Sequence, residues 1–327
     1  VEVVDAGVGT AISGSDYTPI GTQTLTFPVG SPSGTTRTAS LTPINDRLVE
    51  AGETVKLALQ NLTGPATLGT AASTVTITDD ETATLSIPAT DTASEPGGAQ
   101  TTAVTLTVAG TGTGAAALIA PVTAEVVDAS GGTAISGTDY MALATQTVTF
   151  GAGAVSGSSQ NVSLTPINDL LVEGVETVRL LLQNPTGLAT LGTTVSTVTL
   201  DDDETATLSI QATDTATEAG GVQTTDVTLS LAGSGTGTLS LAAPATAEVI
   251  DAGGGSAISG ADYTALVTQT VTFATGSTNG ATQSVSLTPI DDLLVEGAET
   301  IKLALQNPTG LVTLATTTGT VTLDDNE

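Results

Sequence analysis

Polar and apolar residues alternate along residues 81–203, in short segments separated by Gly, Ser, Asn and Pro. The polar positions are mostly Thr and Ser, and the apolar positions are Val, Leu, Ile or Phe. A period of two is typical of β-strands with one buried face, and Thr suits the other face because its branched Cβ favours extended backbone. The alternation predicts strands at 82–87, 101–108, 123–128, 145–150, 160–167, 176–183 and 195–200.

Seven short strands with no segment of helical period predict an all-β fold, an immunoglobulin-like antiparallel β-sandwich. Gly-rich stretches such as 110–114 and 233–237 fall inside this unit, so we expect hairpin loops there rather than flexible linkers. The aromatic residues are few, and we expect all of them to pack in the core: Tyr17, Tyr140, Tyr263, Phe27, Phe150 and Phe273.

The same pattern recurs at a constant spacing of 123 residues, as Asp16, Asp139 and Asp262 show. Recurrence at a fixed period indicates a tandem repeat. The boundary between copies leaves almost no slack, so successive sandwiches should stack end to end. Because the first copy matches only the last 80 positions of the repeat, we expect a piece of a longer protein. The expected domains are a truncated copy at 1–80 and complete copies at 81–203 and 204–327.

The composition argues against several classes of function. The formal net charge of −29 opposes binding to nucleic acid or anionic membrane, which select basic patches. The absence of Cys excludes disulfides, thiolate metal sites and a cysteine nucleophile. With no His, no Cys and no Ser paired with a recognisable base, we do not expect an enzyme. No apolar run reaches the roughly 18 residues of a membrane span.

Acidic residues concentrate in the predicted loops, while the outward strand positions carry Thr and Ser. In residues 81–203 the only basic residue is Arg179. Asp139 precedes the fourth strand, and the loop between the fifth and sixth strands carries Asp169 and Glu173, so these acids should meet at one end of the sandwich. The loop acids of this copy and its boundary are Glu95, Asp139, Asp169, Glu173, Asp201, Asp202, Asp203 and Glu204.

Carboxylates that meet within a few ångströms disfavour one another's ionisation, so a positive charge is needed among them. Ca²⁺ fits because it takes six to eight oxygen ligands in irregular geometry. Mg²⁺ is an alternative but prefers fewer carboxylates, and zinc, copper and iron are disfavoured without His or Cys. An acidic coat for solubility would instead spread acids over outward strand positions. Six of the loop acids carry a summed charge of −6, which predicts at least two ions per complete copy: Glu95, Asp139, Asp169, Glu173, Asp202 and Asp203.

Other acids have less definite interpretations. Glu176, three residues after Glu173, is equally compatible with a ligand, a supporting residue or an exposed side chain. Glu125 and Asp128 are expected to belong to strand and turn structure.

Four segments resemble a known family. GTAISGTDY (132–140), TQTVTF (145–150), VSLTPINDLLVEGVETVRLLL (162–182) and STVTLDDDE (196–204) are similar, in the same order, to the Calx-beta motif. This family consists of Ca²⁺-binding immunoglobulin-like domains, found in sodium–calcium exchangers, integrin β4 and large bacterial surface proteins. The resemblance covers copies two and three and the later part of copy one.

The resemblance implies ligands by position. Copy two offers Glu95, Asp139, Asp169, the carbonyl of Leu171, Glu173, Asp202, Asp203 and Glu204. Copy three offers Glu218, Asp262, Asp291, Asp292, Glu296 and Asp325. Copy one offers Asp16, Asp46, Glu50, Asp79, Asp80 and Glu81. The departures are Asn45 and Asn168 at the first position of the acidic loop, and Asn326 in the terminal cluster.

Three functions are open at this stage. The leading hypothesis is a calcium-binding tandem repeat that serves as a rigid spacer or adhesive arm of an extracellular or cell-surface bacterial protein. Thr-rich strands, scarce Lys and the absence of Cys favour it. A module that binds glycans or a protein partner would be favoured by exposed aromatic residues. A calcium-sensing region of a membrane protein would resemble the exchanger's use of the domain.

Overall fold

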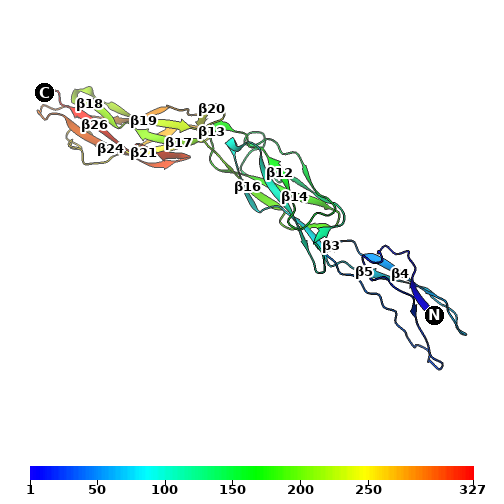
Figure 1. Ribbon diagram of the computed structural model, residues 1–327. Helices are drawn as coiled ribbons and strands as arrows, with labels where there is room; N and C mark the ends of the chain where they lie inside the picture. The colour runs from blue at the N-terminus through cyan, green and yellow to red at the C-terminus, as the bar shows by residue number, and fades with distance from the viewer.

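The computed structural model describes residues 1–327, and its regular structure is almost entirely β. The three copies lie end to end in an elongated chain with a bend between the second and third copies (Figure 1). The helices are two single turns, η1 (Glu95–Gly97) and η2 (Glu218–Gly220). Neither has the length and apolar character that crossing a membrane requires.

Copy two is a sandwich of two sheets. The five-stranded sheet has the order β11-β10-β14-β16-β7, and the four-stranded sheet has the order β12-β8-β6-β15. The bounds are β6 (Thr82–Ser86), β7 (Thr90–Ser94), β8 (Gln100–Ala109), β10 (Val122–Asp128), β11 (Gln146–Phe150), β12 (Ser159–Leu164), β14 (Glu176–Thr186), β15 (Ala189–Leu191) and β16 (Val195–Asp201).

The β-sandwich prediction is confirmed, and all seven predicted strands are present. The pairs that they form with one another are antiparallel. The departures lie at the sheet edges, where β7 pairs in parallel with β16 and β15 pairs in parallel with β6. The chain bends after β6 and continues as β7 in the other sheet, which places the two N-terminal strands on opposite layers.

The alternation predicted from the sequence is the alternation of burial. β10 and β16 bury every second residue, and the core between the sheets includes Leu85, Leu106, Leu182 and Phe150, none more than 1% exposed. Removal of this apolar surface from water is the main stabilising contribution to such a fold.

Copy three repeats this arrangement, with sheets ordered β23-β19-β17-β25 and β18-β26-β24-β21-β22. Its bounds are β17 (Thr205–Ile210), β18 (Thr213–Thr217), β19 (Gln223–Ala232), β20 (Thr236–Leu241), β21 (Ala245–Asp251), β22 (Gln269–Phe273), β23 (Thr282–Leu287), β24 (Glu299–Thr309), β25 (Val312–Leu314) and β26 (Thr318–Asp324).

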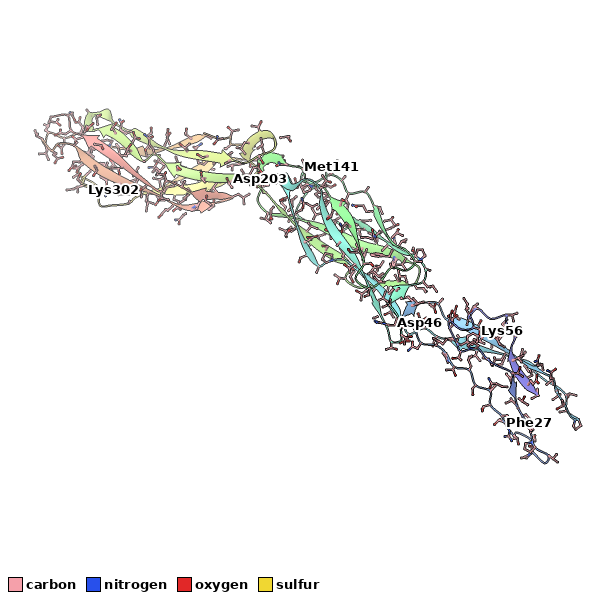
Figure 2. All side chains as sticks on the ribbon, in the orientation of Figure 1. Phe27, Asp46, Lys56, Met141, Asp203 and Lys302 are labelled. Atoms are coloured by element: carbon pink, nitrogen blue, oxygen red, sulfur yellow. The ribbon has the colours of Figure 1, made fainter.

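Copy one forms a single sheet in the order β2-β1-β4-β5 and has no counterparts of β6 and β8. The strands are β1 (Glu2–Asp5), β2 (Gln23–Thr24), β4 (Glu53–Gln60) and β5 (Ala72–Ile77). The prediction that all aromatic residues are buried is wrong at Phe27, which is 48% exposed because no second sheet covers it (Figure 2). Its ring centroid lies 5.6 Å from the Arg37 guanidinium carbon.

Two short strands join successive copies. β3 (Leu48–Val49) of copy one pairs in parallel with β9 (Ala117–Leu118) of copy two. β13 (Asp169–Val172) of copy two pairs in the same way with β20 of copy three. Because these strands lie inside the acidic loops, the acids are held at the ends of the sandwiches that face a neighbouring copy (Figure 2).

Candidate metal centre

In copy two the structure brings predicted site residues together in two clusters. The inner cluster consists of Asp139, Glu173 and Glu176, and the junction cluster consists of Glu95, Asp203 and Glu204. Within each cluster, one carboxylate oxygen from every residue lies within 4.8 Å of the others. Two ligands on opposite sides of a Ca²⁺ ion are about 4.8 Å apart, twice the ~2.4 Å of a calcium–oxygen bond.

The inner cluster is assembled by a turn and by the start of a strand. Asp139 accepts a hydrogen bond from the backbone N–H of Ile135, which closes the turn before Tyr140. The Tyr140 hydroxyl donates to Asp128 over 2.6 Å, and this contact anchors the turn to the end of β10. Glu176 begins β14, so it faces Asp139 from the sheet.

The junction cluster is buried where copy two meets copy three. Glu95 and Glu204 are 5% and 6% exposed. The backbone of Gly233 passes so close to Glu204 that a Cβ at this position would lie 2.3 Å from Glu204 Oε1. The Gly-rich loop after β19 therefore covers the carboxylate, and only glycine leaves room for it.

Asp202 lies between the two clusters and binds backbone. One of its carboxylate oxygens accepts the N–H groups of Glu173 and Gly174, both over 2.9 Å, and the other accepts the N–H of Glu204 over 2.9 Å. Asp169 accepts the N–H of Leu171 over 2.7 Å. These hydrogen bonds fix the acidic loop against the end of β16.

Burial and mutual repulsion disturb the ionisation of both clusters. Burial raises the pKa of Glu95 to about 7, and the negative charge of Asp202 adds to the effect. Burial likewise raises the pKa of Glu173 to about 7, reinforced by Asp139. The pKa of Glu204 is raised to about 8 by burial and by its contact with Asp202. Full ionisation near neutral pH therefore requires a bound positive charge.

The buried oxygens of the clusters have no donors around them. Both carboxylate oxygens of Glu204 are buried without a hydrogen-bond partner, as are Glu95 Oε2, Asp203 Oδ1 and Glu176 Oε2. Buried polar atoms are nearly always hydrogen-bonded, and ionised carboxylates can only accept. A hard cation would pair with these oxygens. No basic side chain can do so, because the one basic residue of this copy, Arg179, is exposed on β14.

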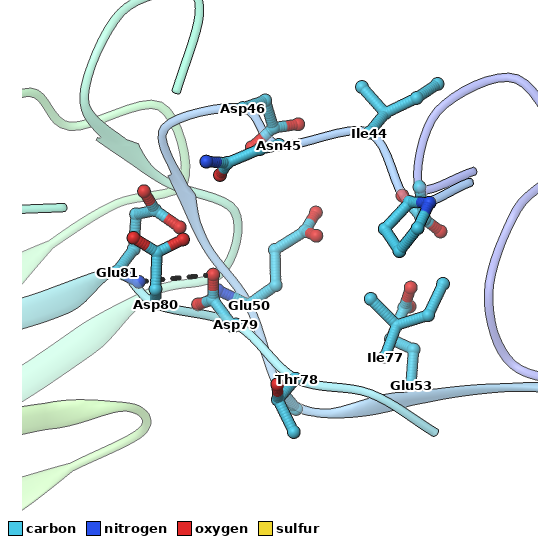
Figure 3. Close-up of a pocket in the computed structure, with 13 residues that line it drawn as sticks. Ile44, Asn45, Asp46, Glu50, Glu53, Ile77, Thr78, Asp79, Asp80 and Glu81 are labelled. Atoms are coloured by element: carbon cyan, nitrogen blue, oxygen red, sulfur yellow. Dashed lines mark hydrogen bonds between the residues drawn. The ribbon is translucent and has the colours of Figure 1, made fainter. Parts of the chain in front are cut away.

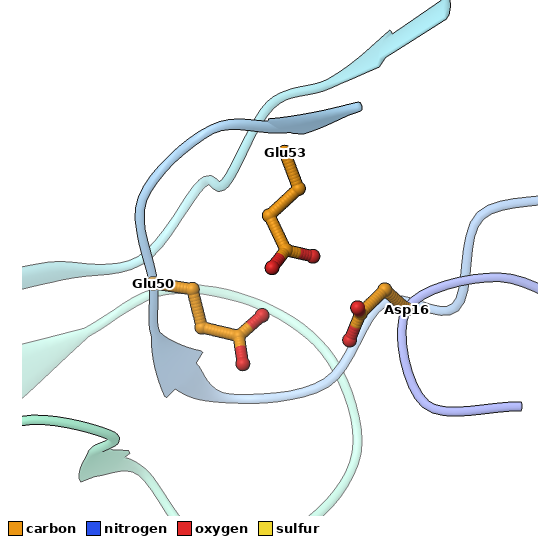
Figure 4. Close-up of side chains that lie close together, drawn as sticks. All are labelled: Asp16, Glu50 and Glu53. Carbon is orange, nitrogen blue, oxygen red and sulfur yellow. The ribbon is translucent and has the colours of Figure 1, made fainter. Parts of the chain in front are cut away.

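Copy one has an inner cluster of the same kind. The carboxylates of Asp16, Glu50 and Glu53 turn toward one another (Figure 4). The pocket that contains this cluster extends toward copy two, where it is also lined by Asp46, Asp79 and other acids (Figure 3). Copy one has no counterpart of Glu95, so its acids next to copy two lack the member that η1 supplies in copy two.

Copy three contains both clusters, with one exchange. Its inner cluster is Asp262, Glu296 and Glu299. Its junction cluster is Glu218, Asp291 and Glu327, in which Asp291 replaces the counterpart of Asp203. The counterpart of Asp203 is Asn326, and the counterpart of Asp291 in copy two is Asn168. The number of carboxylates in the cluster is therefore conserved, although their positions differ.

The matches of the Calx-beta domain model span most of the chain, at residues 3–81, 99–212 and 201–327. The chain belongs to the Calx-beta family. No curated protein matches it.

Solved structures similar to this Calx-beta chain include CBD12 from CALX1.2, with 17% sequence identity, a TM-score of 0.32 and coverage of 73% of this chain and 98% of that one. The apo-form Calx CBD1 domain has 22% identity, a TM-score of 0.30 and coverage of 38% and 99%. The I-band fragment I67–I69 of titin has 8% identity, a TM-score of 0.28 and coverage of 84% and 74%.

Most members of these Calx-beta clusters were predicted from the sequence, but the inner cluster was left incomplete, and Glu327 in the junction cluster of copy three was not among the predicted ligands. Glu176 had no definite role, and its counterparts Glu53 and Glu299 were not among the predicted ligands. The available signal was their constant spacing of three residues after Glu50, Glu173 and Glu296.

Some predicted residues lie beside the clusters rather than in them. Asp202 and its counterparts Asp79 and Asp325 bind backbone N–H groups of the acidic loop. Asp201 is exposed and belongs to neither cluster. The role of the Leu171 carbonyl as a ligand stays a prediction.

Proposed function

We propose that this Calx-beta chain is a calcium-binding tandem repeat that holds at least two Ca²⁺ ions in each complete copy. One ion would lie in the inner cluster and one in the junction cluster, with Asp169 and Asp202 between them. The charges of both aspartates raise the pKa of Glu95 in one cluster and of Glu173 in the other, which supports a single, electrostatically connected site. When bound, the ions supply the positive charge that the buried carboxylates lack.

The observation that carries this proposal is the environment of Glu204. Both of its carboxylate oxygens are buried and unpartnered, and Asp203 Oδ1 beside it is in the same condition. Ionised Glu204 would place a negative charge on two oxygens shielded from water, with the half-buried Asp203 adding a second charge beside it, which is costly unless a cation pairs with them. Calcium suits the site better than magnesium because Mg²⁺ keeps several waters and binds fewer protein carboxylates.

Thermal unfolding and calorimetric titration test the proposal. A ligand that binds only the folded state adds about 2.7 kcal/mol of stability at a hundredfold excess over its Kd. We expect Ca²⁺ to raise the melting temperature above that in chelator, and Mg²⁺ at equal concentration to raise it less. The matched control is Asp201→Asn, which removes an exposed acid outside both clusters. Identical melting curves in Ca²⁺ and chelator would contradict the proposal.

We further propose that the array serves as a stiff spacer or adhesive arm of a bacterial cell-surface or secreted protein, with a binding rather than a catalytic role. The end-to-end arrangement of the copies (Figure 1) and the position of the acids at the junctions support a spacer. The Thr-rich strands and the absence of Cys favour export. Small-angle scattering with Ca²⁺ and with chelator tests the stiffening, and superimposable profiles while Ca²⁺ binds would contradict it.

A further inference from the structure

Both junctions use the same parallel strand pairing in the same register. At the first junction Val49 lies opposite Leu118, and at the second junction Val172 lies opposite Leu241. Val49 and Val172 are 3% and 2% exposed, and each belongs to the apolar core of the copy that follows it. A residue of one copy therefore completes the core of the next.

Backbone hydrogen bonds before and after the paired residues also occur at both junctions. At the second junction the N–H of Ala242 donates to the carbonyl of Val172 over 3.2 Å, and the N–H of Thr236 donates to the carbonyl of Asn168 over 3.3 Å. Directly before Thr236, the backbone at Gly235 approaches copy two so closely that a Cβ there would lie 1.8 Å from the Asp169 carbonyl oxygen.

The first junction has the same close approach. Gly112 would place a Cβ 1.8 Å from the Asp46 carbonyl oxygen, and the N–H of Ala117 donates to the carbonyl of Arg47 over 3.1 Å. Two junctions built from different copies thus reproduce one docking geometry, which indicates a specific interface rather than an accident of stacking.

The third copy carries the same segment without an acceptor. Residues 292–295 are the counterpart of β13, but they form no strand. Leu293, Leu294 and Val295 are 88%, 59% and 82% exposed. Three consecutive exposed apolar residues are unusual on a soluble surface, and here their counterparts show what covers them.

We propose that residues 292–295, the docking segment of copy three, bind a further Calx-beta repeat whose own acceptor strand is free. The acceptor strand is the counterpart of Ala117–Leu118 in β9 and of Ser240–Leu241 in β20. Val295 then inserts into the core of that repeat, as Val172 does in copy three. The docking segment is an interaction surface of the chain, and this proposal does not depend on whether the acidic clusters bind calcium.

A second molecule of this chain does not fit as the partner. Its acceptor strands in copies two and three are already paired with β3 and β13 of the same chain. The residues of the acceptor strands are apolar or small, and they pair through backbone groups, so the partner is recognised by a free strand edge and by room for a valine.

The experiment joins residues 205–327 directly after Glu327, because Glu327 stands where Glu204 stands in copy two. Hydrogen exchange of peptides covering 290–297 is compared between the natural chain and this four-copy chain, in Ca²⁺ and in chelator. We expect exchange at 294–296 of copy three to slow by about tenfold or more, to the rate of 171–173 in the natural chain, because paired amides exchange only on local opening. Because the fourth copy of this version repeats residues 290–297, only half of the signal from these peptides should slow; a second version carries residues 82–203 as the fourth copy, so that 290–297 occurs once.

Two variants of the four-copy chain sharpen the test. Val295→Asp should restore fast exchange at 294–296, whereas Val295→Ile should keep it slow. Unchanged exchange at 294–296 beside a folded fourth copy would overturn the proposal, and so would a fourth copy that folds in neither version. Exchange that slows in the natural chain as its concentration rises would also overturn it, since the partner would then be a second molecule.

Discussion

Asp203 and Asp291 occupy equivalent places in the junction clusters of successive copies, although they stand at different positions of the repeat. Asp203 follows the last strand of copy two, whereas Asp291 lies in the acidic loop of copy three. The two positions are occupied by Asp and Asn in opposite order in the two copies. The structure therefore indicates that the cluster needs one carboxylate from this pair and that either position can supply it.

This exchange predicts a rescue. Asp203→Asn should remove one Ca²⁺ from copy two, because the junction cluster loses an oxygen-rich ligand and one negative charge. Adding Asn168→Asp to this variant reproduces the pattern of copy three and should restore the ion. Calorimetric titration measures the stoichiometry of each variant.

The control for the rescue is Asn168→Asp alone, which should keep the original stoichiometry. If the double variant binds no more Ca²⁺ than Asp203→Asn does, the two positions are not interchangeable and the acids in the two copies have different roles.

Asp202 and Asp203 are adjacent in sequence, but they should respond in opposite ways to loss of charge in the absence of metal. Asp202→Asn replaces a carboxylate that accepts three backbone N–H groups, and hydrogen bonds to charged groups contribute about 1.5–3 kcal/mol each. Asn keeps one acceptor oxygen, so about one of these bonds is lost and the free energy of unfolding in chelator should fall by roughly 1.5–3 kcal/mol. Asp203→Asn replaces Oδ1, which is buried without a partner, while the remaining oxygen can still accept from the N–H and hydroxyl of Ser234, so that free energy should stay unchanged or rise.

Denaturant unfolding in chelator checks this difference. Asp201→Asn serves as the control because Asp201 is exposed and lies outside the clusters. Equal losses for Asp202→Asn and Asp203→Asn would show that neither side chain has the role assigned to it.

The strands of the sandwich could be predicted from sequence because polar and apolar residues alternate within each strand in step with their burial. In β11 the alternation of exposed Thr with buried Val and Phe is local and complete. The junction strands could not be predicted in this way. Leu171 and Val172 stand inside an acidic loop, and their partners lie in the next copy, so nothing within the segment reveals the pairing.

The candidate site was predictable as a set of acids but not as two clusters. Glu95, Asp139 and Glu173 are far apart in sequence, and only the sandwich brings their loops to one end. Their division between an inner and a junction cluster depends on side-chain direction. The role of Glu176 could not be predicted from sequence, because a carboxylate at the start of a strand can point either toward Asp139 or into solvent.

The raised pKa values predict an unusual dependence of stability on pH. The pKa values of Glu95 and Glu173 rise from 4.5 to about 7, mainly through burial. Between about pH 4.5 and pH 7 the folded state keeps protons that the unfolded state has lost. The contribution of these groups is therefore complete below pH 4.5 and is lost as the pH rises through 7. In chelator, stability should fall over this window.

With saturating Ca²⁺ the fall should disappear, because the bound ions stabilise the ionised carboxylates of the folded state. Melting temperatures measured from pH 4.5 to pH 8 with Ca²⁺ and with chelator test this. Glu95→Gln should reduce the slope in chelator, since the glutamine does not titrate. A melting temperature that rises with pH in chelator would contradict the assigned environment of these carboxylates.

The close approach at Gly235 predicts a variant that separates the copies without unfolding them. In Gly235→Ala the added Cβ would lie 1.8 Å from the Asp169 carbonyl oxygen, a distance that the backbone cannot absorb, so β13 and β20 must move apart. Val172 would then lose its place in the core of copy three. The array should become flexible at the second junction alone, with amides of 171–173 exchanging faster by about tenfold or more while those of β19 stay protected.

Hydrogen exchange and small-angle scattering of the same samples measure this, in the presence of Ca²⁺. Gly151→Ala is the control, because a Cβ at Gly151 meets no atom within 4 Å. The first junction provides an internal reference, since Gly112 and its contact with Asp46 are unchanged. If Gly235→Ala leaves both the exchange at 171–173 and the scattering profile unaltered, the parallel pairing does not hold the copies together, and the stiffness of the array must come from the ions at the junction.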